Sequence, residues 1–94
     1  MSTVIDNPAE HRFELPIDGS EGDIAAAYYR VEGERLILIH TEVPQQFSGQ
    51  GIGSQLARGV FDAIRATGRK VVLRCSFMGA YYARHPEYSD IVVG

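Results

Sequence analysis

The sequence predicts an α+β fold in which a mixed, mainly antiparallel sheet packs against one long helix and a second, short helix. Hydrophobic residues alternate with a period of two over residues 12–17, which is typical of a half-buried strand, and two further strand-like apolar segments follow as far as residue 40. The period then changes to 3.6 over residues 52–68, which indicates an amphipathic helix. An apolar strand on each side of that helix completes one βαβ unit, whose two strands should pair in parallel through a right-handed crossover.

The first half of the chain predicts an antiparallel meander. Residues 1–10 are polar and are expected to form a loose lead-in. The alternation over residues 12–17 predicts a strand, which Pro16 places at an edge of the sheet because proline cannot donate a ladder hydrogen bond. Residues 24–31 predict a second strand, and a tight turn leads from it into the apolar run 36–40. An unbroken apolar run is typical of a strand that is covered on both faces.

The second half predicts the βαβ unit and a short final helix. The apolar stripe of the long helix repeats at steps of four: Ile52, Leu56, Val60 and Ile64. Gly68 follows the last apolar position and predicts the C-terminus of this helix. Residues 70–75 predict the parallel partner strand. Ser76 predicts the N-cap of a helix that runs to about Arg84, because the residue before Pro86 disfavours helical geometry.

Length and composition exclude several classes of protein. The chain has 94 residues, of which 45% are hydrophobic and 22% charged, and this predicts one packed domain over residues 1–94. The net charge of −3 argues against nucleic acid as a partner. The single cysteine cannot form an internal disulfide, and no Cys/His set has the spacing of a metal site. No signal peptide or membrane-spanning run is recognised, so a cytoplasmic protein without a membrane partner is expected.

The loop before the long helix is rich in glycine and reads Ser48-Gly49-Gln50-Gly51-Ile52-Gly53-Ser54. Alternate glycines allow a sharp turn and a close approach of the backbone to a ligand. The loop also opens a helix, whose first N–H groups lack partners and carry partial positive charge. Together these features predict a cradle for a phosphate or pyrophosphate.

Three phosphate-binding signatures can be compared with this loop. A P-loop requires Gly-Lys-Ser/Thr at the helix start, and no lysine lies nearby. The dinucleotide pattern GxGxxG fails because Ser54 replaces the third glycine and no acidic residue follows about 20 positions later. The loop resembles the acetyl-CoA pyrophosphate loop of the GCN5-related N-acetyltransferases, written Arg/Gln-x-x-Gly-x-Gly/Ala. Ser48 replaces the opening Arg or Gln of that pattern, and Gln46, two places earlier, is a candidate substitute.

The resemblance extends over about residues 12–92 through further segments. They are His40-Thr41-Glu42-Val43-Pro44 before the loop and Cys75-Ser76-Phe77, Tyr81-Tyr82 and His85-Pro86-Glu87-Tyr88 after it. These segments are similar to small, single-domain N-acetyltransferase-like proteins, which lack the N-terminal helices that bind substrate in larger members. The resemblance implies CoA or acetyl-CoA bound between the splayed ends of the two parallel strands. The cofactor-binding positions that it implies are Thr41, Val43, Gly49, Gln50, Gly51, Ile52, Gly53, Ser54, Ser76, Tyr81, Tyr82 and Arg84.

Three residues are candidates for catalysis. Acetyl transfer needs a deprotonated amine, and either Glu42 at the strand end or His40 is a candidate general base. The alternative is a solvated carboxylate and a half-buried histidine without a catalytic role. Cys75 ends the second parallel strand just before a helix start, where a thiolate is favoured, so it is a candidate nucleophile that first receives the acetyl group. Its alternative role is that of a small apolar filler of the core.

The sequence therefore predicts an acetyl-CoA-dependent N-acetyltransferase that acts on a small amine or an exposed peptide amine. Three tyrosines are candidates for protonating the departing CoA thiolate, with packing as their alternative role: Tyr81, Tyr82 and Tyr88. One alternative function is a module that binds CoA or acyl-CoA with little or no turnover. Another is a structural domain whose apolar cleft is filled by a different chain. The expected partners are acetyl-CoA and an amine acceptor that the sequence does not identify.

Overall fold

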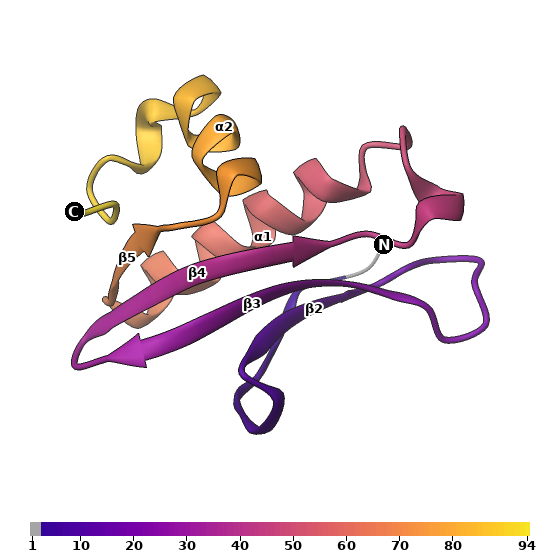
Figure 1. Cartoon of the computed structure of the whole chain (residues 1–94), viewed down its shortest axis with the longest axis horizontal. Coiled ribbons are helices and arrows are strands. Elements are labelled where there is room, and N and C mark those ends of the chain that lie inside the picture. The colour runs from indigo at the N-terminus through magenta and orange to yellow at the C-terminus, as the bar shows by residue number, and fades with distance from the viewer. Residues whose placement is uncertain (1–2) are drawn as a thin grey trace.

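The computed structural model describes residues 3–94 and has the predicted α+β architecture (Figure 1). The strands are β1 (Ile5–Asn7), β2 (Arg12–Pro16), β3 (Ile24–Glu32), β4 (Arg35–Glu42) and β5 (Lys70–Leu73). The helices are α1 (Ile52–Thr67) and α2 (Ser76–Arg84), and single 3₁₀ turns cover residues 8–10, 45–47 and 86–88. Strand β4, helix α1 and strand β5 form the predicted βαβ unit.

The five strands lie in the sheet in the order in which they occur in the chain. The first three neighbouring pairs are antiparallel and the pair β4–β5 is parallel, as the sequence predicts. The outer side of β5 is partly covered by the end of the chain. The Val71 N–H donates to the Ile91 carbonyl at 2.8 Å, and the Val93 N–H donates to the Val71 carbonyl at 2.9 Å. This added pairing fixes the segment that follows α2.

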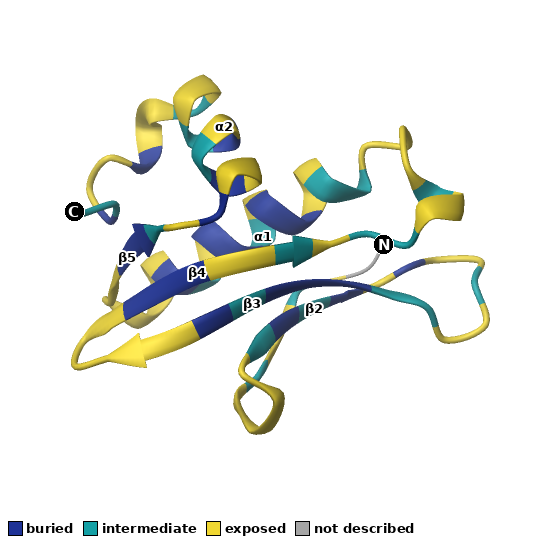
Figure 2. Ribbon diagram, in the orientation of Figure 1, coloured by how far each residue is buried: buried dark blue, intermediate teal, exposed yellow. Residues whose placement is uncertain are grey.

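Both helices pack on one face of the sheet. Figure 2 shows that α1, β3, β4 and β5 each contain buried residues. The main members of this core are Phe13, Leu15, Ala25, Ala27, Tyr29, Leu36, Leu38, Leu56, Ala57, Val60, Phe61, Ile64, Val71, Met78 and Tyr81. Phe61 of α1 stacks on Tyr81 of α2 with ring centroids 5.8 Å apart and on Tyr88 with centroids 4.9 Å apart. These stacks join α1 to the C-terminal segment.

The opposite side of the sheet, called the open face below, is defined by the strand register. Residues that pair directly across neighbouring strands share a face. Two adjacent rows of paired residues on this face are Glu14–Ala26–Glu42 and Arg12–Tyr28–His40. Of these six residues only Ala26 is buried, and within residues 3–94 neither helix packs over them. A molecule can therefore approach the sheet from this side.

The first residues are more structured than the sequence predicts, although Met1 and Ser2 lie outside the described residues. Residues 5–10, which were expected to form a loose lead-in, contain β1 and a 3₁₀ turn. The Asn7 amide donates to the Glu14 carboxylate at 2.9 Å and so ties β1 to β2. The prediction was wrong because a three-residue strand is too short to show a period of two.

Strand β2 is second in the sheet and not at its edge, which corrects the interpretation of Pro16. Strand β1 pairs only with residues 12–14. Pro16 lies beyond the reach of β1, so its missing N–H leaves no gap in the ladder. The side chains of Phe13, Leu15 and Ile17 are buried, as the alternation predicts.

A bulge at Ile39 bends β4. The pairing of β4 with β3 shifts by one residue between Leu38 and His40, so Ile39 has no partner on β3. Leu36, Ile37 and Leu38 are buried, as the unbroken apolar run predicts, whereas Ile39 and His40 are exposed, so the prediction of cover on both faces is wrong for the end of the run 36–40. Residues 39 and 40 lie beyond the last pair of β4 with β5, which is Leu38–Leu73.

Strands β4 and β5 separate beyond Leu38, where their register ends. The Arg74 N–H still donates to the Leu38 carbonyl at 2.9 Å. Strand β5 ends two residues before the predicted Cys75, which is instead the N-cap of α2, so the predicted cap Ser76 is the first residue of the helix. Strand β4 continues to Glu42 without pairing to β5. The splayed strand ends leave room between β4 and the start of α2.

Candidate functional site

The glycine loop places an uncapped helix N-terminus near the end of β4. Gly49 and Gly51 have positive φ angles of 79° and 76°, a conformation that favours glycine. Gly51 is the N-cap of α1, and no side chain bonds to the first helical N–H groups. The Gln55 N–H makes the first helical bond, to the Gly51 carbonyl at 3.1 Å. The N–H groups of residues 52–54 therefore lack helical partners and carry partial positive charge.

A cavity of about 300 Å³, called the slot below, opens at this helix end. Its lining residues are Thr41, Val43, Phe47, Ser48, Gly49, Gly51, Ile52, Gly53 and Phe77. They come from the end of β4, the glycine loop and the first turn of α2, so the slot lies where β4 has separated from β5. No basic side chain is among these residues. An anion in the slot would therefore depend on the backbone N–H groups of α1.

Phe77 forms one wall of the slot. Its ring lies so close to Gly53 that a Cβ added to this glycine would lie 2.7 Å from Cζ of the ring. A side chain at Gly53 would therefore require the Phe77 ring to move. The Phe77 side chain is 40% exposed, so it also presents an apolar surface to a molecule in the slot.

A second cavity of about 680 Å³, called the groove below, lies on the open face. Its lining residues are Arg12, Ile24, Ala26, Tyr28, His40, Thr41, Glu42, Val43 and Pro44. Thr41 and Val43 line both the slot and the groove. Because the slot lies on the helix side of the sheet and the groove on the open face, the two cavities meet at the end of β4.

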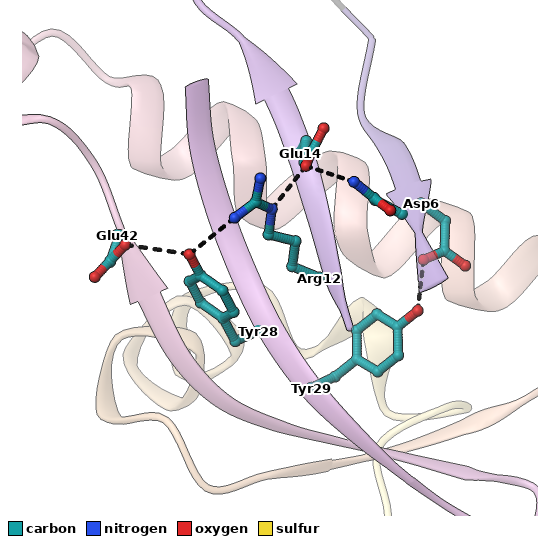
Figure 3. Close-up of polar contacts among 7 residues, drawn as sticks. Asp6, Arg12, Glu14, Tyr28, Tyr29 and Glu42 are labelled. Atoms are coloured by element: carbon teal, nitrogen blue, oxygen red, sulfur yellow. Dashed lines mark hydrogen bonds and ion pairs between the residues drawn. The ribbon is translucent and has the colours of Figure 1, made fainter. Parts of the chain in front are cut away.

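A row of hydrogen bonds crosses the groove (Figure 3). Arg12 Nε donates to Glu14 Oε2 at 2.7 Å, and Arg12 Nη1 donates to the Tyr28 hydroxyl at 3.3 Å. The Tyr28 hydroxyl donates to Glu42 Oε1 at 3.4 Å. On the other oxygen of Glu42, Oε2 lies 3.3 Å from His40 Nε2. The row thus connects β2 to the end of β4.

The two carboxylates in this row, Glu14 and Glu42, differ in their exposure to solvent. Hydrogen bonds from Asn7 and Arg12 hold the pKa of Glu14 below its usual value. The bond to Glu14 raises the pKa of Arg12 in turn, so this pair stays ionised at neutral pH. The Glu42 side chain is 61% exposed. Of the two carboxylates in the row, Glu42 is the one open to a cation that approaches from solvent.

Cys75 lies close to the junction of the two cavities. Its Sγ is 3.2 Å from the Thr41 hydroxyl oxygen, a contact that joins the start of α2 to β4. Cys75 is only 9% exposed and is not among the residues that line the slot or the groove. The sulfur therefore contacts Thr41, which lines the junction, but does not itself line either cavity.

Half of the predicted cofactor-binding residues line the slot: Thr41, Val43, Gly49, Gly51, Ile52 and Gly53. The other half lies elsewhere. Gln50 and Ser54 line neighbouring cavities on either side of α1. Ser76 is exposed at the start of α2. Tyr82 and Arg84, further along α2, are not among the residues that line the slot.

The C-terminal tyrosines have the contacts of packing residues, and none of the three lines the slot. Tyr81 is buried, and its ring also stacks on His85 with centroids 4.1 Å apart. This burial raises the pKa of Tyr81. The Tyr88 hydroxyl donates to Asp62 at 2.8 Å, and burial together with this bond raises the pKa of Tyr88 to about 12. Tyr82 packs against the core from its edge.

The sequence analysis missed several residues of the two cavities. Arg12 and Tyr28 belong to the groove only because the register aligns them with His40 on an uncovered face, and a single sequence does not show this register. The only indication of Phe77 in the sequence is its place in the segment Cys75-Ser76-Phe77. Gln46, the candidate substitute for the missing basic residue of the loop, donates instead to Asp23 at 3.4 Å.

Within residues 3–94, no group of three or more His, Cys, Asp and Glu side chains could hold a metal ion. Over the same residues, no helix has the length and apolar character needed to cross a bilayer.

The sequence and the fold are similar to those of known proteins. A family model described as GCN5-related N-acetyl-transferase matches residues 12–91. Protein NATD1 of Mus musculus and Protein NATD1 of Gallus gallus are each 32% identical to the chain over 76 residues, which is 80% of this chain and 68% of each relative. The solution structure of a GCN5-like candidate N-acetyltransferase from Staphylococcus aureus matches with a TM-score of 0.70 at 26% identity. That match covers 97% of this chain and 87% of the other.

Proposed function

The chain belongs to the GCN5-related N-acetyltransferase family, and from this premise we propose that it transfers an acetyl group from acetyl-CoA to a primary amine. One observation carries the proposal: the slot beside the α1 N-terminus and the groove on the open face meet at Thr41 and Val43. Two substrates can therefore approach the end of β4 from opposite faces of the sheet. Holding both reactants in this way is a large part of what group transfer requires.

The chemistry of the slot fits the pyrophosphate of acetyl-CoA. The N–H groups of residues 52–54 have no helical partners, and a Cβ added to Gly51 would meet no atom within 4 Å, so space beside the helix end is open. Thr41 and Val43 would contact the part of the cofactor that reaches the junction. When bound, acetyl-CoA supplies an acyl carbon activated as a thioester.

Glu42 acts as the general base in this proposal. His40 contacts the carboxylate of Glu42, with Nε2 lying 3.3 Å from Oε2. An ammonium group in the groove meets the exposed carboxylate of Glu42 and loses a proton to it. The nitrogen lone pair then forms the new N–C bond as the C–S bond breaks. The nitrogen loses its second proton to solvent, and the departing thiolate takes a proton from solvent. Glu42 returns its proton to solvent, to which it is 61% exposed. A well-placed base of this kind contributes roughly 10²–10⁴-fold to the rate.

A covalent relay through Cys75 is the alternative route. In that route the thiolate of Cys75 displaces the CoA sulfur from the acyl carbon, and the amine later displaces Cys75. The 3.2 Å contact between Sγ and the Thr41 hydroxyl supports it by proximity. The burial of Cys75, and its absence from the lining of both cavities, favour direct transfer.

A second candidate function is a module that binds acetyl-CoA without turnover. It is favoured by the open face, over which neither helix packs within residues 3–94. An amine in the groove is therefore bounded from one side by described residues, whereas small-molecule sites usually enclose most of the ligand surface.

One experiment separates these functions. Acetyl-CoA is titrated into the protein by calorimetry, and release of the CoA thiol is followed with n-butylamine, putrescine and the peptide acetyl-Gly-Lys-Gly-amide. We expect acetyl-CoA to bind and at least one amine to be acetylated. The variant Glu42→Gln should bind acetyl-CoA normally and transfer roughly 10²-fold more slowly. Glu32→Gln, which changes an exposed carboxylate at the other end of the sheet, is the matched control.

The three possible failures have different meanings. Binding of acetyl-CoA without transfer to any amine supports the module. Lack of acetyl-CoA binding contradicts both functions. Transfer at the wild-type rate in Glu42→Gln contradicts the assignment of the base alone.

A further inference from the structure

We propose that Tyr28, held in place by Arg12, is a positioning residue for the Glu42 carboxylate. The inference rests on the proposed function, in which Glu42 takes the proton of the acceptor amine. It gives a role to two residues of β2 and β3 that do not lie on the strand bearing the base. Their contacts fix the direction of the hydrogen-bond row that crosses the groove (Figure 3).

Three contacts fix Tyr28 itself. Its ring stacks on His40 with centroids 5.9 Å apart and planes inclined at 27°. The Arg12 guanidinium carbon lies 5.8 Å from the ring centroid, and Nη1 donates to the hydroxyl at 3.3 Å. Arginine can only donate, so the hydroxyl oxygen accepts at this contact. The hydroxyl hydrogen is then left for Glu42 Oε1 at 3.4 Å.

Arg12 is anchored on its far side. Its Nε donates to Glu14 Oε2 at 2.7 Å, and the Asn7 amide donates to the same oxygen at 2.9 Å. The side chains of Arg12 and Glu14 are only 24% and 20% exposed, so solvent competes weakly for these bonds. The guanidinium is therefore a fixed point in the sheet, and Tyr28 is held against it.

Glu42 needs such support because of its place in the fold. It is the last residue of β4, beyond the bulge at Ile39 and beyond the end of the pairing with β5. An exposed glutamate at a strand end has several rotamers available, and holding it in one loses side-chain entropy. The Tyr28 hydroxyl on Oε1 and His40 near Oε2 hold the carboxylate on the groove side of the strand. This is the side from which an amine reaches the junction with the slot.

The test compares two neighbouring tyrosines. Tyr28→Phe removes the hydroxyl and keeps the ring. Tyr29→Phe is the matched control, because it removes a hydroxyl that donates to Asp6 at 2.6 Å and belongs to the core side of the sheet (Figure 3). The first readout needs no acceptor: three-bond couplings measured by NMR report whether the Glu42 side chain occupies one rotamer or averages over several.

We expect one dominant Glu42 rotamer in the wild type and in Tyr29→Phe, and averaging in Tyr28→Phe. The variant Arg12→Met should give averaging as well, and Arg12→Lys should restore part of the order. If Glu42 already averages in the wild type, or keeps one rotamer in Tyr28→Phe, the positioning role is wrong.

The second readout is turnover with acetyl-CoA and the peptide acetyl-Gly-Lys-Gly-amide. We expect Tyr28→Phe to lower kcat about tenfold, with the KM for acetyl-CoA unchanged. In a Glu42→Gln background the same change should have no further effect, because it acts through Glu42. A full additional loss in that background overturns the inference. A wild type that acetylates none of n-butylamine, putrescine and the peptide counts against the proposed function, while the Glu42 rotamers still decide the positioning role.

Discussion

At the residue scale, three consecutive side chains at the end of β4 serve two cavities. His40 and Glu42 pair with Tyr28 and Ala26 on the open face, whereas Thr41 pairs with Ala27, a core residue. This alternation follows from the period of two in a strand. It explains how one short segment can bring a base to the groove and a hydroxyl to the slot.

The role of Cys75 can be tested by removing its sulfur. Cys75→Ala should bind acetyl-CoA as the wild type does, because the predicted cradle consists of backbone N–H groups. We also expect it to keep most of its transfer activity, because Cys75 is buried and lines neither cavity. The measurements are calorimetry and CoA release. An acetyl adduct on the Cys75 peptide after rapid quenching, together with an inactive Cys75→Ala, would establish the covalent relay instead.

The stability of the folded protein should depend on pH through the Glu14 carboxylate, and the contacts of this carboxylate give the direction of the dependence. Its pKa in the folded protein is lowered from the usual 4.5 by the bonds from Asn7 and Arg12. Its contribution to stability is therefore present above pH 4.5 and is lost as the pH falls through the lower, folded-state pKa. Urea unfolding at neutral and acid pH should show that the free energy of unfolding falls less on acidification in Glu14→Gln than in the wild type. Glu21→Gln, in an exposed turn, should match the wild type, and equal acid losses in all three proteins would contradict the assignment.

At the scale of elements, the sequence predicts helices better than it predicts irregularities of strands. Helix α1 begins and ends where the apolar stripe and the flanking glycines place it, because both signals are local. The bulge at Ile39 is not predictable, since this isoleucine looks like any other apolar residue of the run 36–40. The early end of β5 is equally hidden. The bulge and the early end of β5 open the space between β4 and α2. The sequence therefore indicates the glycine loop on one side of the slot but not Phe77 on the other.

The anion cradle of α1 can be tested with a charge pair of equal shape. Gly51→Asp and Gly51→Asn impose the same strain at φ 76°, and both residues are favourable N-caps. Only Asp places a negative charge beside the phosphates of acetyl-CoA. Gly51→Asp should lower the affinity at least tenfold relative to Gly51→Asn, which corresponds to about 1.4 kcal/mol. Calorimetry measures the affinities, and thermal unfolding shows that both variants fold. Equal affinities would contradict the prediction that the phosphates of acetyl-CoA bind at this loop.

At the scale of the whole molecule, the functional geometry depends on which face of the sheet is left bare. The right-handed crossover fixes the side on which α1 lies. Helix α2 follows the edge strand β5, and the burial of Met78 together with the stacking of Tyr81 on Phe61 places it on the same side. The α+β class follows from periodicity alone, but this choice of side is a matter of tertiary packing. Arg12 and Tyr28 therefore became visible as site residues only in the folded chain.

A ligand that binds only the folded state should stabilise this chain measurably. Acetyl-CoA at a hundred times its Kd should add about 2.7 kcal/mol to the free energy of unfolding. At roughly 4–8 °C per kcal/mol for a domain of this size, the Tm should rise by roughly 11–22 °C. NAD and ATP should raise it much less, since the loop lacks the third glycine of one signature and the lysine of the other. With acetyl-CoA, Gly51→Asp should lose most of the rise in Tm and Gly51→Asn should keep it. A larger rise in Tm with ATP than with acetyl-CoA would assign the slot to a different ligand.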